Sequence, residues 1–154
     1  MKLFKLERQQ YVPWGIEKTW EFFSDPRNLA TITPPSLDFK ITCDPPQRMY
    51  PGLLISYTVR PLLGLPVTWV TEITQVEKPY RFIDEQRHGP YRIWHHEHTF
   101  KVAADGVGTE VRDVVQYGFA VALLDELVEP IFIAPRLKEI FDFRAAKVEE
   151  LAKK

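Results

Sequence analysis

The stretch YRIWHHEHTFKVA, residues 91–103, stands at the centre of the pattern that decides the fold. Its residues alternate in character, and turn-forming sequences bound it, HGP before and ADGVG after. Successive side chains of a strand point to opposite faces, so the stretch predicts one long β-strand. His95 and Glu97 share the face that we expect to lie in water. The more apolar face, which should point to the core, carries Trp94, His96, His98 and Phe100.

Six further strands are predicted on either side of this stretch, at residues 2–12, 37–43, 52–60, 67–76, 81–87 and 109–120. From residue 52 onward, short turn sequences separate them, beginning with PLLGLP at 61–66. Proline interrupts interior strands, and none occurs between Pro90 and Pro130. The strands after residue 52 are therefore expected to form an antiparallel meander.

Helical spacing occurs after the first strand and again near the end of the chain. Ile16, Trp20 and Phe23 fall at i, i+4 and i+7, which predicts a short helix. Asp25 followed by Pro26 is typical of an N-cap and a first helical position, so a second short helix is expected at 26–30. The segment 136–154 predicts a long amphipathic helix whose apolar stripe holds Leu137, Ile140, Phe141, Val148 and Leu151.

This order of elements predicts an α+β fold in one domain, residues 1–154. The expected architecture is a curved seven-stranded antiparallel sheet with two short helices after the first strand. A long C-terminal helix crosses the sheet and encloses a cavity against it, and such spaces often bind ligands.

Composition excludes several classes of function. The net charge of −1 and a sequence pI near 6.4 give no basic surface for nucleic acid. No apolar run approaches the ~18 residues that span a bilayer, so no membrane insertion is expected. The first residues lack the apolar core of a signal peptide. The single cysteine, Cys43, fits a reducing compartment, so we expect a cytoplasmic protein.

Polar residues gather on the inward faces of three successive predicted strands. The more apolar face around 81–88 includes Asp84 and Gln86, and that of 109–120 includes Asp113 and Tyr117. For 67–76, the face with Trp69 and Gln75 is favoured. A buried polar group without a partner costs about 1–3 kcal/mol. These groups must therefore pair with one another, hold water or line a cavity.

Two chemistries could use this inward set. His96 and His98 lie roughly 6.5–7 Å apart along the strand. That spacing serves a metal if Asp84 or Asp113 completes the site, but His-x-His alone is a weak signal, so no metal or cofactor is expected. Either histidine beside either aspartate could instead act as a general base, with Tyr117 as an oxyanion donor. A satisfied hydrogen-bond network that fixes sheet register is the structural alternative.

Several motifs together resemble a known family. They are NLATITPP (28–35), W-x-T-x-I (69–73), FIDEQRHGPY (82–91), W-x-H-x-H-x-F (94–100), D-x-V-x-Y (113–117) and IFDFR (140–144). With the element order, they resemble the START-like, or helix-grip, superfamily, which includes Bet v 1-type allergens and polyketide cyclases. They look most like a bacterial ligand-binding subgroup labelled cyclase/dehydrase-like. The resemblance implies a deep cavity for a small hydrophobic or amphipathic molecule, and no single reaction.

Three functional hypotheses follow. The first is binding, with transport or sensing as its purpose, of a small amphipathic molecule. The second is a cyclase or dehydratase that uses His96 or His98 with Asp84 or Asp113. The third is a partner-binding domain that uses the apolar segment 121–134, which could also be a lid, a buried helix or the surface of a homodimer. The residues expected to contact a ligand are Trp69, Asp84, Gln86, Trp94, His96, His98, Phe100, Asp113, Tyr117 and Phe141.

Overall fold

A single antiparallel sheet and one long C-terminal helix dominate the computed structural model, which describes residues 1–61 and 63–154. The described residues contain seven strands, in the spatial order β1-β7-β6-β5-β4-β3-β2. They are β1 (Phe4–Val12), β2 (Lys40–Ile41), β3 (Leu54–Val59), β4 (Val67–Glu77), β5 (Arg81–His88), β6 (Ile93–Val102) and β7 (Thr109–Gly118). The predicted α+β, helix-grip architecture is confirmed.

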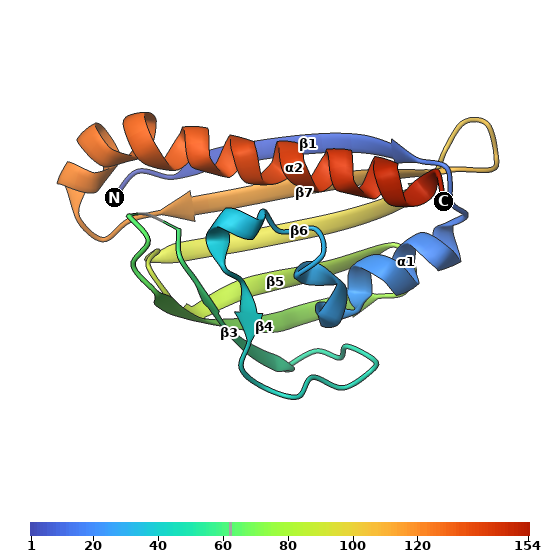
Figure 1. Cartoon of the computed structure of the whole chain (residues 1–154), viewed down its shortest axis with the longest axis horizontal. Helices are drawn as coiled ribbons and strands as arrows, with labels where there is room; N and C mark the ends of the chain where they lie inside the picture. The colour runs from blue at the N-terminus through green and yellow to red at the C-terminus, as the bar shows by residue number, and fades with distance from the viewer. Residues whose placement is uncertain (62) are drawn as a thin grey trace.

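The helices cover one face of the sheet (Figure 1). After β1 come the helix α1 (Ile16–Ser24) and two 3₁₀ helices, η1 (Pro26–Leu29) and η2 (Pro35–Leu37). Asp25 caps η1 as expected, because its carboxylate accepts a hydrogen bond from the backbone N–H of Arg27. At the C-terminus, the π-helical segment η3 (Leu124–Ile133) runs directly into α2 (Ala134–Ala152).

The apolar stripe of α2 packs against the sheet. Leu137, Phe141 and Val148 are buried, whereas Ile140 and Leu151 are half-buried. The amphipathic pattern of residues 136–154 therefore correctly identified the helix and the face that it buries. In this view α2 lies over β1 and β7, and α1 and the short helices lie over the strands next to them (Figure 1).

Two strand predictions differ from the structure in detail. The strand expected at 37–43 is reduced to Lys40–Ile41, because Pro35 opens the short helix η2 directly before it. In β4, a register shift between Ile73 and Gln75 changes the alternation, so that Gln75 is exposed and Val76 packs against the core. The turn expected at 61–66 includes Leu62, which lies outside the described residues.

Three apolar clusters form the core. Trp20 of α1 meets Phe82 and Phe100 edge to face at 5.8 and 5.7 Å, and these rings centre the first cluster. The second lies under α2 and η3 around Val115, and the third lies around Ile73 on β4. Residues of all three clusters border the cavity described below.

The apolar segment 121–134 has one buried and one exposed face. Ile133 and Leu124 pack against the cluster around Val115, and the carboxylates of Asp125 and Glu129 are buried with them. The opposite face leaves apolar side chains in solvent, at Leu123, Leu127, Ile131 and Phe132. Among the described residues, no helix is both long and apolar enough to cross a membrane.

Candidate functional site

A cavity of about 200 Å³ lies between the inner face of the sheet and the helices. Side chains of β3, β4, β5 and β6 form its floor, and side chains of α1, η1, η2 and α2 close it from above. A single buried water needs only about 10–15 Å³. The space is therefore large enough for part or all of a small organic molecule.

Aromatic side chains form much of the cavity wall. Trp69 lies edge to face with Trp94 at 5.3 Å between ring centroids and contacts Tyr91 at 5.5 Å. Tyr57 stacks with Trp69 at 6.0 Å between ring centroids, and Phe141 contributes from α2. Trp69, Trp94 and Phe141 were expected from the sequence to contact a ligand, and each lines the cavity.

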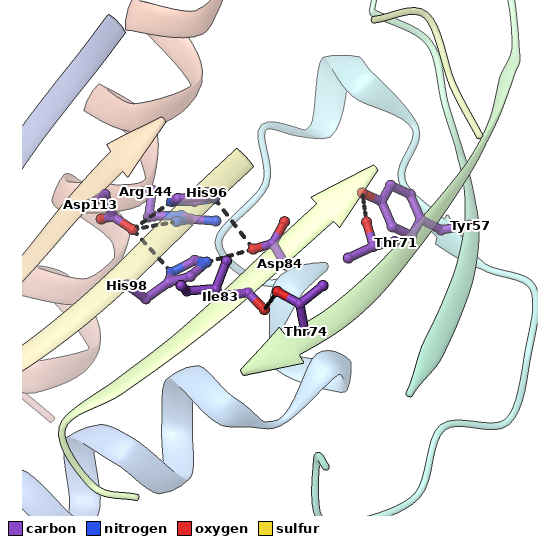
Figure 2. A network of polar contacts seen from close by, with 9 residues as sticks. All are labelled: Tyr57, Thr71, Thr74, Ile83, Asp84, His96, His98, Asp113 and Arg144. Atoms are coloured by element: carbon purple, nitrogen blue, oxygen red, sulfur yellow. Dashed lines mark hydrogen bonds and ion pairs between the residues drawn. The ribbon is translucent and has the colours of Figure 1, made fainter. Parts of the chain in front are cut away.

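One part of the wall is charged. Figure 2 shows the His–Asp cluster, which we define as Asp84 of β5, His96 and His98 of β6, Asp113 of β7 and Arg144 of α2. In the strand register, Asp84 lies opposite His96, and Asp113 lies opposite His98. All four strand residues point to the same face, as the alternation predicts.

The shortest contacts in the His–Asp cluster run diagonally across the strands. His98 Nε2 lies 2.6 Å from Asp84 Oδ2, and His96 Nε2 lies 2.9 Å from Asp113 Oδ1. The directly opposite pairs are longer, at 3.5 Å from His96 Nδ1 to Asp84 Oδ2 and 3.1 Å from His98 Nδ1 to Asp113 Oδ1. Each carboxylate therefore faces both rings, Asp84 from one edge and Asp113 from the other.

Arg144 adds a positive charge on the side of Asp113. Its guanidinium lies 3.4 Å from Asp113 Oδ1 and 5.0 Å from the ring centroid of Phe141. With both aspartates ionised, one protonated histidine makes the His–Asp cluster neutral. Since an unbalanced charge is costly away from water, this is the favoured state of the metal-free cluster near neutral pH.

The surroundings move the pKa values of the two histidines in opposite directions. Burial lowers the pKa of His98, but hydrogen bonds to Asp113 and Asp84 outweigh it, so the net pKa is raised. Burial and the nearby charge of His98 lower the pKa of His96, and the two aspartates do not fully compensate. These directions favour His98 over His96 as the protonated ring.

Both carboxylates remain ionised despite their burial. Burial raises the pKa of Asp113, but hydrogen bonds from His96 and His98 and the charge of Arg144 hold it well below its ordinary value. Burial also raises the pKa of Asp84, and its interactions with His96 and His98 lower it by more.

Unpaired donors occur along the same wall. Within residues 1–61 and 63–154, two buried nitrogens of cavity-lining side chains lack a hydrogen-bond partner, Trp69 Nε1 and Arg144 Nε, and His98 Nδ1 makes no well-aligned hydrogen bond although Asp113 Oδ1 lies 3.1 Å away. A buried donor without a partner costs about 1–3 kcal/mol. Water or a ligand with acceptor atoms would remove that penalty.

The other side chains expected to contact a ligand lie behind the wall. The amide of Gln86 hydrogen-bonds to the backbone of Tyr91 and so holds a wall residue in place. Asp113 supports the two histidines from the far edge of their rings. Phe100 packs on Trp20 in the core, and Tyr117 donates a hydrogen bond to buried Glu129 at 2.6 Å.

Several wall residues were not among the expected ligand contacts. Arg144 lies three residues after Phe141, a spacing that places it on the same face of α2. Thr71 shares a face with Trp69, and its hydroxyl lies 3.1 Å from that of Tyr57. Helical spacing from Phe141 could have predicted that Arg144 lines the cavity, and strand alternation from Trp69 could have predicted the same for Thr71. By contrast, the outward expectation for His95 agrees with the structure, where its Nδ1 lies 2.8 Å from Glu85 Oε1 on the other face.

Comparison with solved structures supports the fold. No family model matches the chain, and no curated protein matches it in sequence. Among solved structures, Ms6760 from Mycobacterium smegmatis has a TM-score of 0.70 at 20% identity, over 97% of this chain and 90% of that one. Ara h 8.0201 has a TM-score of 0.68 at 14% identity, over 98% of both chains.

A third neighbour is ginseng major latex-like protein 151 from Panax ginseng. Its TM-score is 0.69 at 11% identity, over 97% of both chains. It and Ara h 8.0201 are Bet v 1-like proteins. The chain therefore has the helix-grip, Bet v 1-like fold that its motifs and element order resemble.

Proposed function

We propose that this chain binds a small amphipathic organic molecule in the cavity between the sheet and α2. The observation that supports this proposal is that an aromatic wall and a buried charged cluster line one cavity. An apolar core alone needs neither the space nor the charges. Ligand pockets, by contrast, combine apolar walls with a few polar groups that fix orientation.

The wall favours a particular orientation of the ligand. Its apolar body would lie against Trp69, Trp94 and Phe141, where burial is worth roughly 25 cal/mol per Å² of apolar surface. Its polar end would lie at the His–Asp cluster and offer acceptor atoms to the unpaired N–H groups of Trp69 and Arg144. Bet v 1-like neighbours support ligand binding by this fold in general terms.

The test uses one cavity-filling variant and one matched control. Leu137→Trp would place an indole in the cavity, whereas Leu127→Trp makes the same change on the exposed face of η3. Native mass spectrometry of the chain from its own host should show a retained small molecule. After the molecule is removed, the fluorescent amphipath anilinonaphthalene sulfonate should bind the unaltered chain and Leu127→Trp with similar Kd values.

Leu137→Trp should weaken that binding by about tenfold or more, which corresponds to roughly 1.4 kcal/mol. Its fold is checked by circular dichroism, because overpacking costs about 1–3 kcal/mol. Equal probe affinities in a folded Leu137→Trp and the unaltered chain, together with no retained molecule, would overturn the proposal.

The same geometry favours a second candidate, an enzyme of the cyclase or dehydratase type. His96 and His98 line the cavity, and their pKa values are shifted in opposite directions. Such a pair can divide the roles of base and acid, with neutral His96 accepting a proton and charged His98 donating one. This candidate requires that His96→Gln and His98→Gln each abolish turnover of the retained molecule while its binding persists. Turnover that survives both substitutions would exclude the candidate.

A further inference from the structure

Three side chains of the His–Asp cluster converge on one point of the cavity wall. Asp84, His96 and His98 each offer one ligand atom, and these atoms all lie within 4.8 Å of one another. All three residues border the cavity. Figure 2 shows Asp84 facing the two rings from β5, with Asp113 on their far side.

Two of the three pairs of ligand atoms have a spacing close to what a small cation requires. A zinc ion about 2.0–2.1 Å from each ligand atom holds tetrahedral ligands roughly 3.3 Å apart. His96 Nδ1 and Asp84 Oδ2 are already 3.5 Å apart. His98 Nε2 and Asp84 Oδ2 are 2.6 Å apart, so a torsional shift of Asp84 of less than about 1 Å would bring this pair to the same spacing.

Asp113 supplies the outer support that metal-binding histidines use. Such a histidine nearly always donates its second ring N–H to a carboxylate, a carbonyl or water, which fixes its tautomer and orientation. Asp113 Oδ1 lies 2.9 Å from His96 Nε2 and 3.1 Å from His98 Nδ1. Protons on these two nitrogens leave His96 Nδ1 and His98 Nε2, the atoms that face Asp84, with free lone pairs.

The electrostatic balance also suits a cation. The His–Asp cluster contains two carboxylates and one guanidinium, that of Arg144, which forms its ion pair with Asp113 at 3.4 Å. When both histidines are neutral, as metal binding requires, the excess negative charge is therefore concentrated at Asp84. This carboxylate is only 15% exposed, so solvent screens it weakly.

We propose that Asp84, His96 and His98 bind a divalent transition-metal ion, of the zinc and ferrous-iron class, with open coordination positions facing the cavity. Two imidazoles and one carboxylate are a donor set suited to these metals, and three protein ligands leave room for water or a ligand atom. The sequence alone did not favour a metal, because His-x-His by itself is a weak signal, and the convergence of Asp84 on both histidines is visible only in the folded sheet. The inference goes beyond the proposed function, since the ion binds with or without an organic ligand.

The test uses the full, untagged chain, because a histidine tag would bind metal itself. Elemental analysis after purification without chelator, and titration of the metal-free chain with Co²⁺ followed by visible absorption, should both give one metal per chain. Asp84→Asn and His98→Gln should weaken Co²⁺ binding by more than about 100-fold, and Asp113→Asn by about 10–100-fold. His95→Gln, a change on the same strand but on the outer face, should leave binding unchanged.

A measurement on the unaltered chain makes the test independent of how the variants fold. Addition of Zn²⁺ should shift the ¹⁵N resonances of His96 Nδ1 and His98 Nε2 and leave those of His95 in place. Failure to bind one equivalent of Zn²⁺ or Co²⁺ at micromolar concentration, or equal binding by a folded Asp84→Asn, would overturn the inference. If the chain binds the organic ligand but no metal, only the metal site is contradicted. If it binds metal but no organic ligand, only the proposed function is contradicted.

Discussion

The tilted rings of His96 and His98 lie with their centroids 3.7 Å apart, and both rings contact the same two carboxylates. Two imidazolium ions at this separation would repel each other strongly in a site shielded from water. The pair therefore accommodates one proton more readily than two. This relationship connects the electrostatics of the cavity to the stability of the fold.

Titration of the metal-free chain should separate the two histidines. The pKa of His98 is raised, so its proton stabilises the fold fully below about pH 6.5, the unfolded value, and this contribution is lost as the pH rises through the folded pKa. The pKa of His96 is lowered, so the unfolded chain gains a proton first and stability falls as the pH drops below about 6.5. The contribution of the two histidines to the free energy of unfolding should therefore peak near that pH. Urea unfolding measures this contribution, and NMR titration measures the two pKa values.

Removal of one histidine should change the pKa of the other. The charge of His98 is one cause of the lowered pKa of His96, so His98→Gln should raise the pKa of His96. His95→Gln is the matched control on the outer face and should leave the titration of His96 unchanged. NMR titration of the ring protons measures both effects. An unchanged pKa for His96 in His98→Gln would mean that the two rings are not electrostatically coupled.

Asp113 should be essential for stability. Asp113→Asn removes the charge that balances Arg144 and the protonated His98, and loss of one partner of a buried ion pair costs about 3–5 kcal/mol. Asp142→Asn is the matched control on α2, where an exposed carboxylate pairs with Lys138, and it should change the unfolding free energy little. Urea denaturation compares the two. Similar small losses in both variants would show that the inner charge is not required for folding.

The sequence predicted the inner face of the sheet because the two-residue period of a strand depends only on the chain itself. It thereby placed Asp84, His96, His98 and Asp113 on one face of adjacent strands. It could not predict which carboxylate contacts which ring, since the diagonal contacts depend on strand register and side-chain torsions. The approach of Arg144 depends on how α2 is rotated about its axis against the sheet.

The sequence also could not predict which residues on the inner face of a strand line the cavity. Trp94 and Phe100 share a face of β6, yet Trp94 lines the cavity and Phe100 packs against Trp20. The difference arises from the placement of α1 over one end of the sheet, which is a tertiary contact. The register shift after Ile73 likewise reverses the alternation in the second half of β4, and a two-residue pattern cannot predict where an extra residue is inserted.

The hydrogen bond from Tyr117 to Glu129 should stabilise the junction of β7 with η3. Tyr117→Phe removes the hydroxyl that donates at 2.6 Å and leaves a buried carboxylate without this donor, which costs about 1–3 kcal/mol. Tyr11→Phe is the matched control, because its hydroxyl also donates to a carboxylate at 2.6 Å, that of Asp105, but in solvent. Urea denaturation should show a clearly larger loss for Tyr117→Phe. Equal losses would mean that burial adds nothing to this bond.

Phe100 and Phe141 should separate stability from ligand binding. Both rings are buried, at 3% and 5% exposure, so Phe100→Ala and Phe141→Ala should each lower the unfolding free energy by about 3–5 kcal/mol. Only Phe141 borders the cavity and contacts His96, at 5.7 Å between ring centroids. Phe141→Ala should therefore weaken the binding of anilinonaphthalene sulfonate by about tenfold, whereas folded Phe100→Ala should bind it as the unaltered chain does. Because the two changes remove the same side chain at similar stability cost, an equal loss of probe affinity in both variants would show that binding follows global stability and not contact with the cavity.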